Sequence, residues 1–187
     1  MSWFNNLKIG AKITAGFIVL LALLTTLGIV ASFNLRALHK SDTELYERNL
    51  VPIGEIAHVA ISFQRIRVNL RDATIDLQMS DKIERKDRIK ELDAIIYGEL
   101  KKFEKTIKDN EVRQEFEALN ASMTSFSSQK EKILALALVN KNLEAVKYMR
   151  GDALVAAQAI DKSIGKLIDR KTKLAKQRAD NNTVAAN

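Results

Sequence analysis

The sequence predicts an all-α protein in which an N-terminal transmembrane helix continues into an antiparallel up-down four-helix bundle. Three observations indicate this fold class. The 187 residues include one Pro and seven Gly, which leaves little material for the tight turns that sheets require. A long uncharged apolar run lies near the N-terminus. After that run, apolar residues recur at alternating steps of three and four, the period of an amphipathic helix.

The apolar run, ITAGFIVLLALLTTLGIVASF, occupies residues 13–33 and is long enough to cross a hydrocarbon core of about 30 Å. We expect residues 1–12 to form a cytoplasmic tail, in which Lys8 and Lys12 are basic, although the positive charges on the two sides of the run nearly balance. The alternative is a cleaved secretory signal, with small residues at 30–32 near its end. The run exceeds the usual apolar core of about 7–15 residues, which favours an uncleaved anchor.

Residues 34–187 are predicted to form a periplasmic four-helix bundle with helices at about 35–79, 82–107, 111–139 and 143–185. Polar capping residues occupy the breaks between these segments. Pro52 lies inside the first predicted helix and should bend it or mark a local break. The expected core positions of the second and third helices are Ile89, Leu92, Ile96, Leu100, Phe103 and Ile107, and Val112, Phe116, Leu119, Met123, Phe126 and Ile133.

The fourth predicted helix needs as many residues to descend as the first needs to climb, which brings it back to the membrane near the last residue of the sequence. A second membrane span is expected at about this point. The sequence is therefore interpreted either as the N-terminal part of a longer receptor or as a stand-alone anchored bundle.

Composition excludes several function classes. The absence of Cys removes disulfides, thiolate metal sites and cysteine nucleophiles, and only His39 and His58 could supply imidazole. No Gly-rich phosphate loop and no nucleophile elbow is present. We therefore expect no metal, no cofactor and no enzymatic activity. The net charge of +7 does not indicate nucleic acid, because acidic and basic residues interleave from Arg36 onward.

A few cations interrupt the apolar pattern. The first helix is expected to bury Ile53, Ile56, Ala60, Phe63, Arg67, Leu70, Thr74 and Leu77. Arg67 replaces an apolar residue in this series, and Arg71 follows one turn later, so the two guanidiniums could hold a carboxylate. Lys130 is a similar exception on the third helix at nearly the same depth, and Tyr97 could add a hydroxyl.

Small residues at the same depth of the fourth helix, Ala153, Ala156 and Ala157, leave room for a small anionic ligand beside these cations. Two other interpretations stay open. Arg67 could pair with Asp93 across the bundle, and both Arg67 and Lys130 could reach solvent along their methylene stems.

The first helix of the bundle carries more apolar residues than one bundle needs. Those outside the expected core positions are Val59, Ile61, Ile66, Val68 and Ile75. This surplus predicts a homodimer formed through that helix, whereas cover by lipid or by a connecting segment is the alternative.

Two stretches resemble the four-helix-bundle sensor region of bacterial methyl-accepting chemotaxis receptors. The opening WFNNLKIGAKITAGF is similar to the usual receptor start, and residues 133–180, ILALALVNKNLEAVKYMRGDALVAAQAIDKSIGKLIDRKTKLAKQRAD, resemble the turn into the long descending helix. Residues of the first helix that also fit the family pattern are Leu50, Pro52, Ile53, Ile56 and Arg71. The second span, the HAMP linker and the methylated signalling hairpin of such receptors are not in this sequence.

The resemblance implies a dimeric sensor in the bacterial inner membrane. Its bundle would face the periplasm, bind a small molecule such as an organic acid or amino acid, and transmit a displacement of the fourth helix across the membrane. Its chemotaxis adaptor and kinase would be reached only through parts that this chain lacks. Two alternatives stay open, namely the input domain of a histidine kinase or cyclase and a membrane-anchored helical scaffold without a small ligand.

Overall fold

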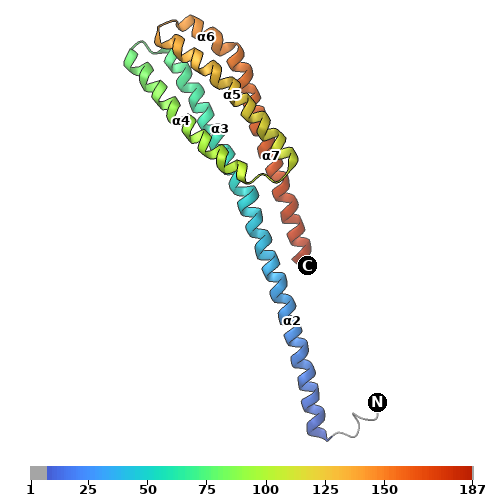
Figure 1. The fold of residues 1–187 in the computed structure, drawn as a ribbon. Helices are drawn as coiled ribbons and strands as arrows, with labels where there is room; N and C mark the ends of the chain where they lie inside the picture. The colour runs from blue at the N-terminus through green and yellow to red at the C-terminus, as the bar shows by residue number, and fades with distance from the viewer. Residues whose placement is uncertain (1–7, 187) are drawn as a thin grey trace. The chain divides into compact units, whose positions relative to one another are not determined.

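The computed structural model describes residues 8–186, and these contain helices and no strand, which confirms the all-α fold class. The helices shown in Figure 1 are α2 (Ile9–Leu45), the π-helical segment η1 (Tyr46–Leu50), α3 (Val51–Ile75), α4 (Met79–Lys105), α5 (Asn110–Leu138), α6 (Asn142–Arg150) and α7 (Asp152–Ala186). Two compact units divide the chain, one of residues 44–178 and the other of residues 1–43 with 179–187.

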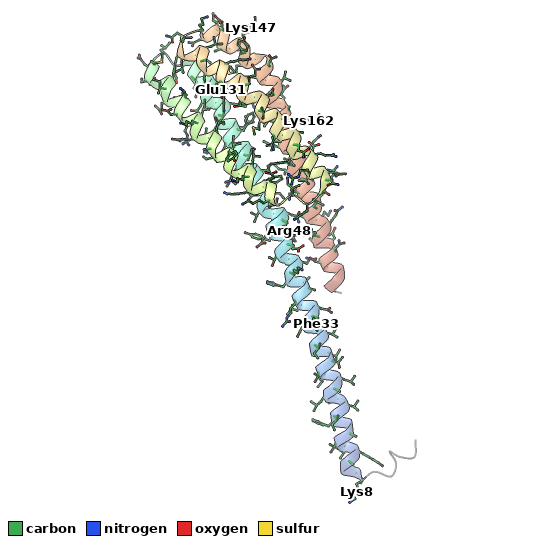
Figure 2. The ribbon with its side chains drawn as sticks, in the orientation of Figure 1. Lys8, Phe33, Arg48, Glu131, Lys147 and Lys162 are labelled. Carbon is green, nitrogen blue, oxygen red and sulfur yellow. The ribbon has the colours of Figure 1, made fainter. Side chains whose placement is uncertain are left out.

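The apolar run of residues 13–33 lies within α2, and its large side chains are exposed, as for Phe33 in Figure 2. Among the described residues, one helical stretch, near the N-terminus, is long and apolar enough to cross a membrane. Its few hydroxyls are satisfied within the helix. Thr14, Thr25, Thr26 and Ser32 each donate to the carbonyl four residues earlier, so no hydroxyl proton of this run is left unpaired.

In the unit of residues 44–178, α3, α4, α5 and the pair α6–α7 enclose one apolar core. Two aromatic pairs fix its middle and one end. Phe63 and Phe126 meet edge to face with ring centroids 4.9 Å apart, and Phe103 stacks on Phe116 at 5.7 Å. The predicted core positions on the second and third helices are buried, apart from Leu100 and Met123, which are half-buried at its border.

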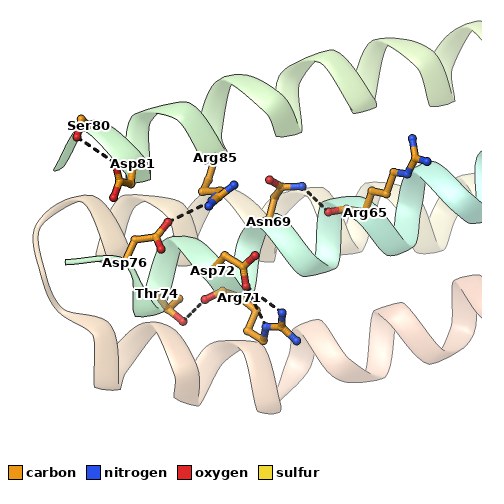
Figure 3. Close-up of polar contacts among 9 residues, drawn as sticks. All are labelled: Arg65, Asn69, Arg71, Asp72, Thr74, Asp76, Ser80, Asp81 and Arg85. Atoms are coloured by element: carbon orange, nitrogen blue, oxygen red, sulfur yellow. Dashed lines mark hydrogen bonds and ion pairs between the residues drawn. The ribbon is translucent and has the colours of Figure 1, made fainter. Parts of the chain in front are cut away.

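The first helix of the bundle differs from its prediction in which residues it buries. Val59 and Ile66, expected outside the core, are both buried, because the core-facing stripe of α3 is wider than a single line of positions. Leu77, expected inside, is 89% exposed because α3 ends at Ile75 and Leu77 lies in the connection to α4. Arg85 closes this connection by donating to the Asp76 carboxylate at 3.1 Å (Figure 3).

The regular helix predicted over 35–79 is interrupted by η1, which ends two residues before Pro52 and is the local irregularity that this proline predicts. The helix predicted over 143–185 is likewise two helices, α6 and α7, separated at Gly151. A Cβ atom at Gly151 would lie 3.3 Å from the Lys147 carbonyl oxygen, so the close backbone approach at this break suits glycine.

The other connections follow capping rules. Asp109 caps α5, its carboxylate accepting from the backbone N–H groups of Glu111 and Val112 at 2.9 and 3.0 Å. At the opposite end of α5, Asn140 has a φ of 59° and allows Lys141 N–H to reach the Leu136 carbonyl at 2.9 Å. This is a Schellman ending with asparagine in the left-handed position.

Candidate functional site

A cavity of about 350 Å³ opens between α3, α5, α6 and α7, directly beside the break at Gly151. Its lining residues are Gln64, Arg67, Val68, Leu70, Arg71, Phe126, Met149, Arg150, Ala153, Leu154 and Ala157. Three arginines therefore share one cavity, and we refer to it as the arginine cavity. Its size is at the lower end of the range of about 300–1,000 Å³ typical of small-molecule sites.

Arg67 is held beside the cavity rather than closed over by the bundle. Its Nη1 donates to Gln64 Oε1 at 3.0 Å and to Asp161 Oδ2 at 3.3 Å, and its guanidinium carbon lies 5.9 Å from the centre of the Phe63 ring. The side chain is 35% exposed. The acidic partner is thus Asp161 of α7 and not Asp93, which was the predicted alternative.

Arg71 follows on the same face of α3, one turn further along. Its Nε and Nη2 both donate to Asp72 Oδ1, at 3.1 and 2.9 Å, as Figure 3 shows. With 56% of its side chain exposed, this ion pair is a surface pair of the kind worth about 0–1 kcal/mol. A bound carboxylate can therefore replace Asp72 as the partner of Arg71 at small cost.

Arg150, the last residue of α6, was missed by the analysis of the sequence. It is exposed, lines the cavity and makes no hydrogen bond or ion pair with any residue of the described chain. The sequence pattern gave no signal for Arg150, because the break at Gly151, which was not predicted, separates it from α7 and sets its position beside the cavity.

The cavity has a polar rim and an apolar floor, which would contact different parts of a ligand. Three guanidiniums face two carboxylates, those of Asp72 and Asp161, so the rim keeps one positive charge in excess. The floor consists of Leu70, Phe126 and the alanines of α7. A fork of arginines over an apolar floor fits an organic anion with a short carbon skeleton.

The two remaining candidates of the sequence analysis lie away from this cavity. Lys130 is buried, and its Nζ donates to Asp93 Oδ2, so this lysine has an acidic partner of its own across α4 and α5. Tyr97 is 69% exposed on α4. Neither residue is among those that line the arginine cavity. The structure thus brings Arg67 and Arg71 together and leaves Lys130 and Tyr97 apart from them.

Metal chemistry has no visible framework in the part of the chain that the structure describes. Within residues 8–186 no group of three or more His, Cys, Asp or Glu side chains is placed to hold an ion.

A helical bundle that continues from a helix long and apolar enough to cross a membrane is typical of helical sensor modules. The chain belongs to the family described as a four helix bundle sensory module for signal transduction, whose model matches residues 6–186. This confirms the predicted resemblance to the sensor region of chemotaxis receptors. Searches of curated proteins and of solved structures each gave no significant match.

Proposed function

We propose that the chain is the ligand-binding region of a bacterial chemotaxis receptor, that its bundle lies in the periplasm, and that the arginine cavity binds a small organic anion. The ligand class is a short carboxylic acid or an amino acid. The observation that carries this proposal is the convergence of Arg67, Arg71 and Arg150 on one open cavity.

The cavity also suggests how binding would act on the rest of the chain. Arg67 contacts Asp161 of α7, and Arg150 lies at the end of α6, one residue before the break that leads into α7. A carboxylate that binds between Arg67 and Arg150 competes with Asp161 for Arg67. It draws α3, which carries Arg67, and α6, which carries Arg150, together. The resulting small shift of α7 is the signal that would cross the membrane, and no catalytic step is part of the proposal.

Ligand binding is tested on the full chain in detergent micelles or nanodiscs. A thermal-shift screen over mono- and dicarboxylates of two to six carbons and over amino acids should raise the melting temperature for at least one compound. Arg150→Gln should weaken the affinity for that compound at least tenfold, since a charge-assisted hydrogen bond is worth about 1.5–3 kcal/mol. Lys147→Gln is the matched control, because Lys147 is exposed on the same helix and does not line the cavity (Figure 2).

Two results would contradict the proposal. One is a folded chain whose melting temperature no compound moves. The other is a bound carboxylate whose affinity is the same in wild type, Arg150→Gln and Arg67→Gln, because the ligand would then lie elsewhere.

The location of the bundle has an independent test, because the chain contains no Cys. Glu131 and Lys147 are exposed on α5 and α6 and accept single-cysteine substitutions without disturbing the core. In cells with a permeabilised outer membrane, a membrane-impermeant maleimide should label Glu131→Cys before lysis. Labelling only after the inner membrane is broken would place the bundle in the cytoplasm instead.

The proposed sensor is a homodimer that uses the exposed apolar residues of α3. Of the residues first expected there, Ile61, Val68 and Ile75 are 50%, 45% and 63% exposed. Ile61→Cys should form an intermolecular disulfide in membranes, whereas Glu117→Cys on the exposed face of α5 should not. Equal crosslinking at both positions would argue against a dimer through α3.

A further inference from the structure

A second cavity, of about 230 Å³, lies where η1, the connection between α4 and α5, and α7 come together. It is remote from the arginine cavity, because Ala157 lines the first and Lys171 the second, and fourteen residues of helix span about 21 Å. The polar residues that line it are Arg48, Asn49, Thr106, Lys108, Asp109, Lys171 and Arg178. We refer to it as the lysine cavity.

Lys171 lines this cavity and donates hydrogen bonds to the backbone around it. Its side chain is buried, and Nζ donates to the carbonyl oxygens of Arg48 and Thr106 at 2.7 and 3.2 Å and to Thr106 Oγ1 at 3.1 Å. The Arg48 carbonyl is available because its donor in a regular α-helix would be the N–H of Pro52, which proline lacks. A proline four residues ahead thus explains both the π-helical segment and the site that Lys171 fills.

Lys108 lies at the rim of this cavity without a partner. It is exposed and makes no hydrogen bond or ion pair within residues 8–186. The Nδ2 of Asn49 also has no hydrogen-bond partner among the described residues, but this atom is buried and does not open onto the cavity.

The charges around the cavity favour an anion. Four cations line it, and the carboxylates nearby are engaged. Asp109 caps α5 through two backbone N–H groups. Glu44 pairs with Arg48 at 3.5 Å and with Arg178 at 3.3 Å. Glu55 also acts on Lys171, so the four cations face three carboxylates, and one positive charge remains in excess.

We propose that the lysine cavity binds a small tetrahedral oxyanion such as phosphate or sulfate. The anion accepts hydrogen bonds from Arg48, Lys108 and Arg178, which come from η1, the α4–α5 connection and α7. Its small volume and many donors suit a compact ion with oxygens on all sides, whereas the larger arginine cavity with its apolar floor suits an organic acid. Because η1 and α7 are the first and last segments of this unit, the bound ion would hold its two chain ends together.

The experiment titrates inorganic phosphate and sulfate into the full chain in nanodiscs of zwitterionic phosphatidylcholine, at constant ionic strength set with chloride. Calorimetry should detect one bound oxyanion per chain, and the melting temperature should rise. Lys108→Gln should weaken binding about five- to tenfold, the loss of one charge-assisted hydrogen bond at an exposed rim. Lys105→Gln is the control, since Lys105 is exposed close by and does not line the cavity.

Further measurements identify which cavity binds the anion and whether the anion is free in solution or part of a lipid. Arg150→Gln should leave phosphate affinity unchanged, which distinguishes this cavity from the arginine cavity and its proposed function. Nanodiscs with phosphatidylglycerol and no free phosphate test a lipid headgroup. A stabilisation by these discs that Lys108→Gln removes would support the oxyanion chemistry with lipid as its source. Phosphate affinity equal in Lys108→Gln and wild type, with no Lys108-dependent effect of the lipid, would overturn the proposal.

Discussion

The interior of the bundle and the arginine cavity use different cations. The buried cations are all lysines, namely Lys82, Lys130 and Lys171. The cations of the arginine cavity, Arg67, Arg71 and Arg150, are half-buried or exposed. Lysine ends in a compact ammonium group with three donors, which suits oxygens that converge in the protein interior. Arginine offers a planar fork on the surface, where a ligand carboxylate can meet it.

In the proposed function, this difference separates lysines that hold the fold from arginines that bind the ligand. Lys82 is fully buried and donates to the Ala137 carbonyl at 2.8 Å and to Asn140 and Asn142 Oδ1 at 2.9 and 3.1 Å. It thereby joins the start of α4 to the end of α5. The arginines of the cavity instead pair with carboxylates that are half-buried or exposed, or, like Arg150, make no hydrogen bond or ion pair in the described chain, so their removal should alter binding more than stability.

Replacing Lys82 should give the largest effect on stability. Lys82→Met fills similar space but leaves the Ala137 carbonyl at the end of α5 and two amide oxygens without a donor. We expect the free energy of unfolding to fall by about 2–4 kcal/mol, since each unsatisfied buried group costs about 1–3 kcal/mol and solvent reaches the two amides in part. Urea denaturation of the full chain in mild detergent, followed by circular dichroism, measures this loss.

Lys86→Met is the matched control, because Lys86 lies one turn later on α4 and is exposed. Its effect should stay within about 0.5 kcal/mol. If Lys82→Met were as stable as Lys86→Met, the interior lysines would not be structural groups and the comparison with the arginines would lose its basis.

Lys171 should make stability depend on pH in the alkaline range. Burial lowers the pKa of Lys171 from 10.5 to about 8, a shift that Arg178 reinforces and that the carboxylates of Glu55 and Asp109 oppose. Between about pH 8 and 10.5 the unfolded chain therefore binds more protons than the folded one, so the contribution of Lys171 to stability rises with pH across this window. Below about pH 8 the cost of burying the charge is fully present.

The measurement is the free energy of unfolding of wild type minus that of Lys171→Met at pH 7 and pH 10. Taking this difference removes the titration of the other lysines and tyrosines. From pH 7 to pH 10 this difference in the free energy of unfolding should increase by about 1–3 kcal/mol in favour of wild type, given 1.36 kcal/mol per pKa unit. A difference that falls or stays constant with pH would mean that the ammonium group is stabilised, not penalised, where it lies.

The arginines should show the reverse pattern, with small effects on stability. Arg67→Gln breaks the ion pair with Asp161, which is half exposed, and should lower the free energy of unfolding by no more than about 1 kcal/mol. Arg150→Gln breaks no contact of the described chain and should change it by less than about 0.5 kcal/mol. Denaturation of both variants without ligand checks this. A loss of several kcal/mol in either would make the cavity a structural feature of the bundle.

Much of the fold could be predicted from the sequence because burial repeats with the helical period. The positions expected on the second and third helices, such as Leu92 and Leu119, are at the core. The wider stripe of α3 could not be predicted, because which helices flank it depends on the assembled bundle. Val59 and Ile66 were therefore assigned to a dimer surface although they face the interior.

The site could be predicted only in part. Arg67 and Arg71 interrupt an apolar series on one helix, a pattern that a sequence reveals, and they do share a cavity. Lys130 interrupts a series in the same way, yet it pairs with Asp93 inside the bundle. Spacing along one helix does not state which acid faces a cation from another helix, so this pattern cannot separate a ligand contact from an internal ion pair.

A further small effect on stability concerns the two glycines of the α6–α7 region. Gly165 lies within α7, and a Cβ there would meet nothing within 4 Å, so Gly165→Ala should raise the free energy of unfolding by about 0.5–1 kcal/mol through helix propensity alone. Gly151→Ala should instead lower it by up to about 1 kcal/mol, because the new Cβ would lie 3.3 Å from the Lys147 carbonyl oxygen and displace the end of α6.

That displacement moves Arg150, the residue just before Gly151. Gly151→Ala should therefore reduce carboxylate affinity several-fold, while Gly165→Ala leaves it unchanged, and one set of calorimetric and denaturation measurements on both variants tests the two statements together. Opposite signs in stability, with a loss of affinity only at Gly151, would show that the helix break positions the free arginine. If both variants gained stability and bound ligand equally well, α6 and α7 could join into one helix without cost, and the break would have no part in recognition.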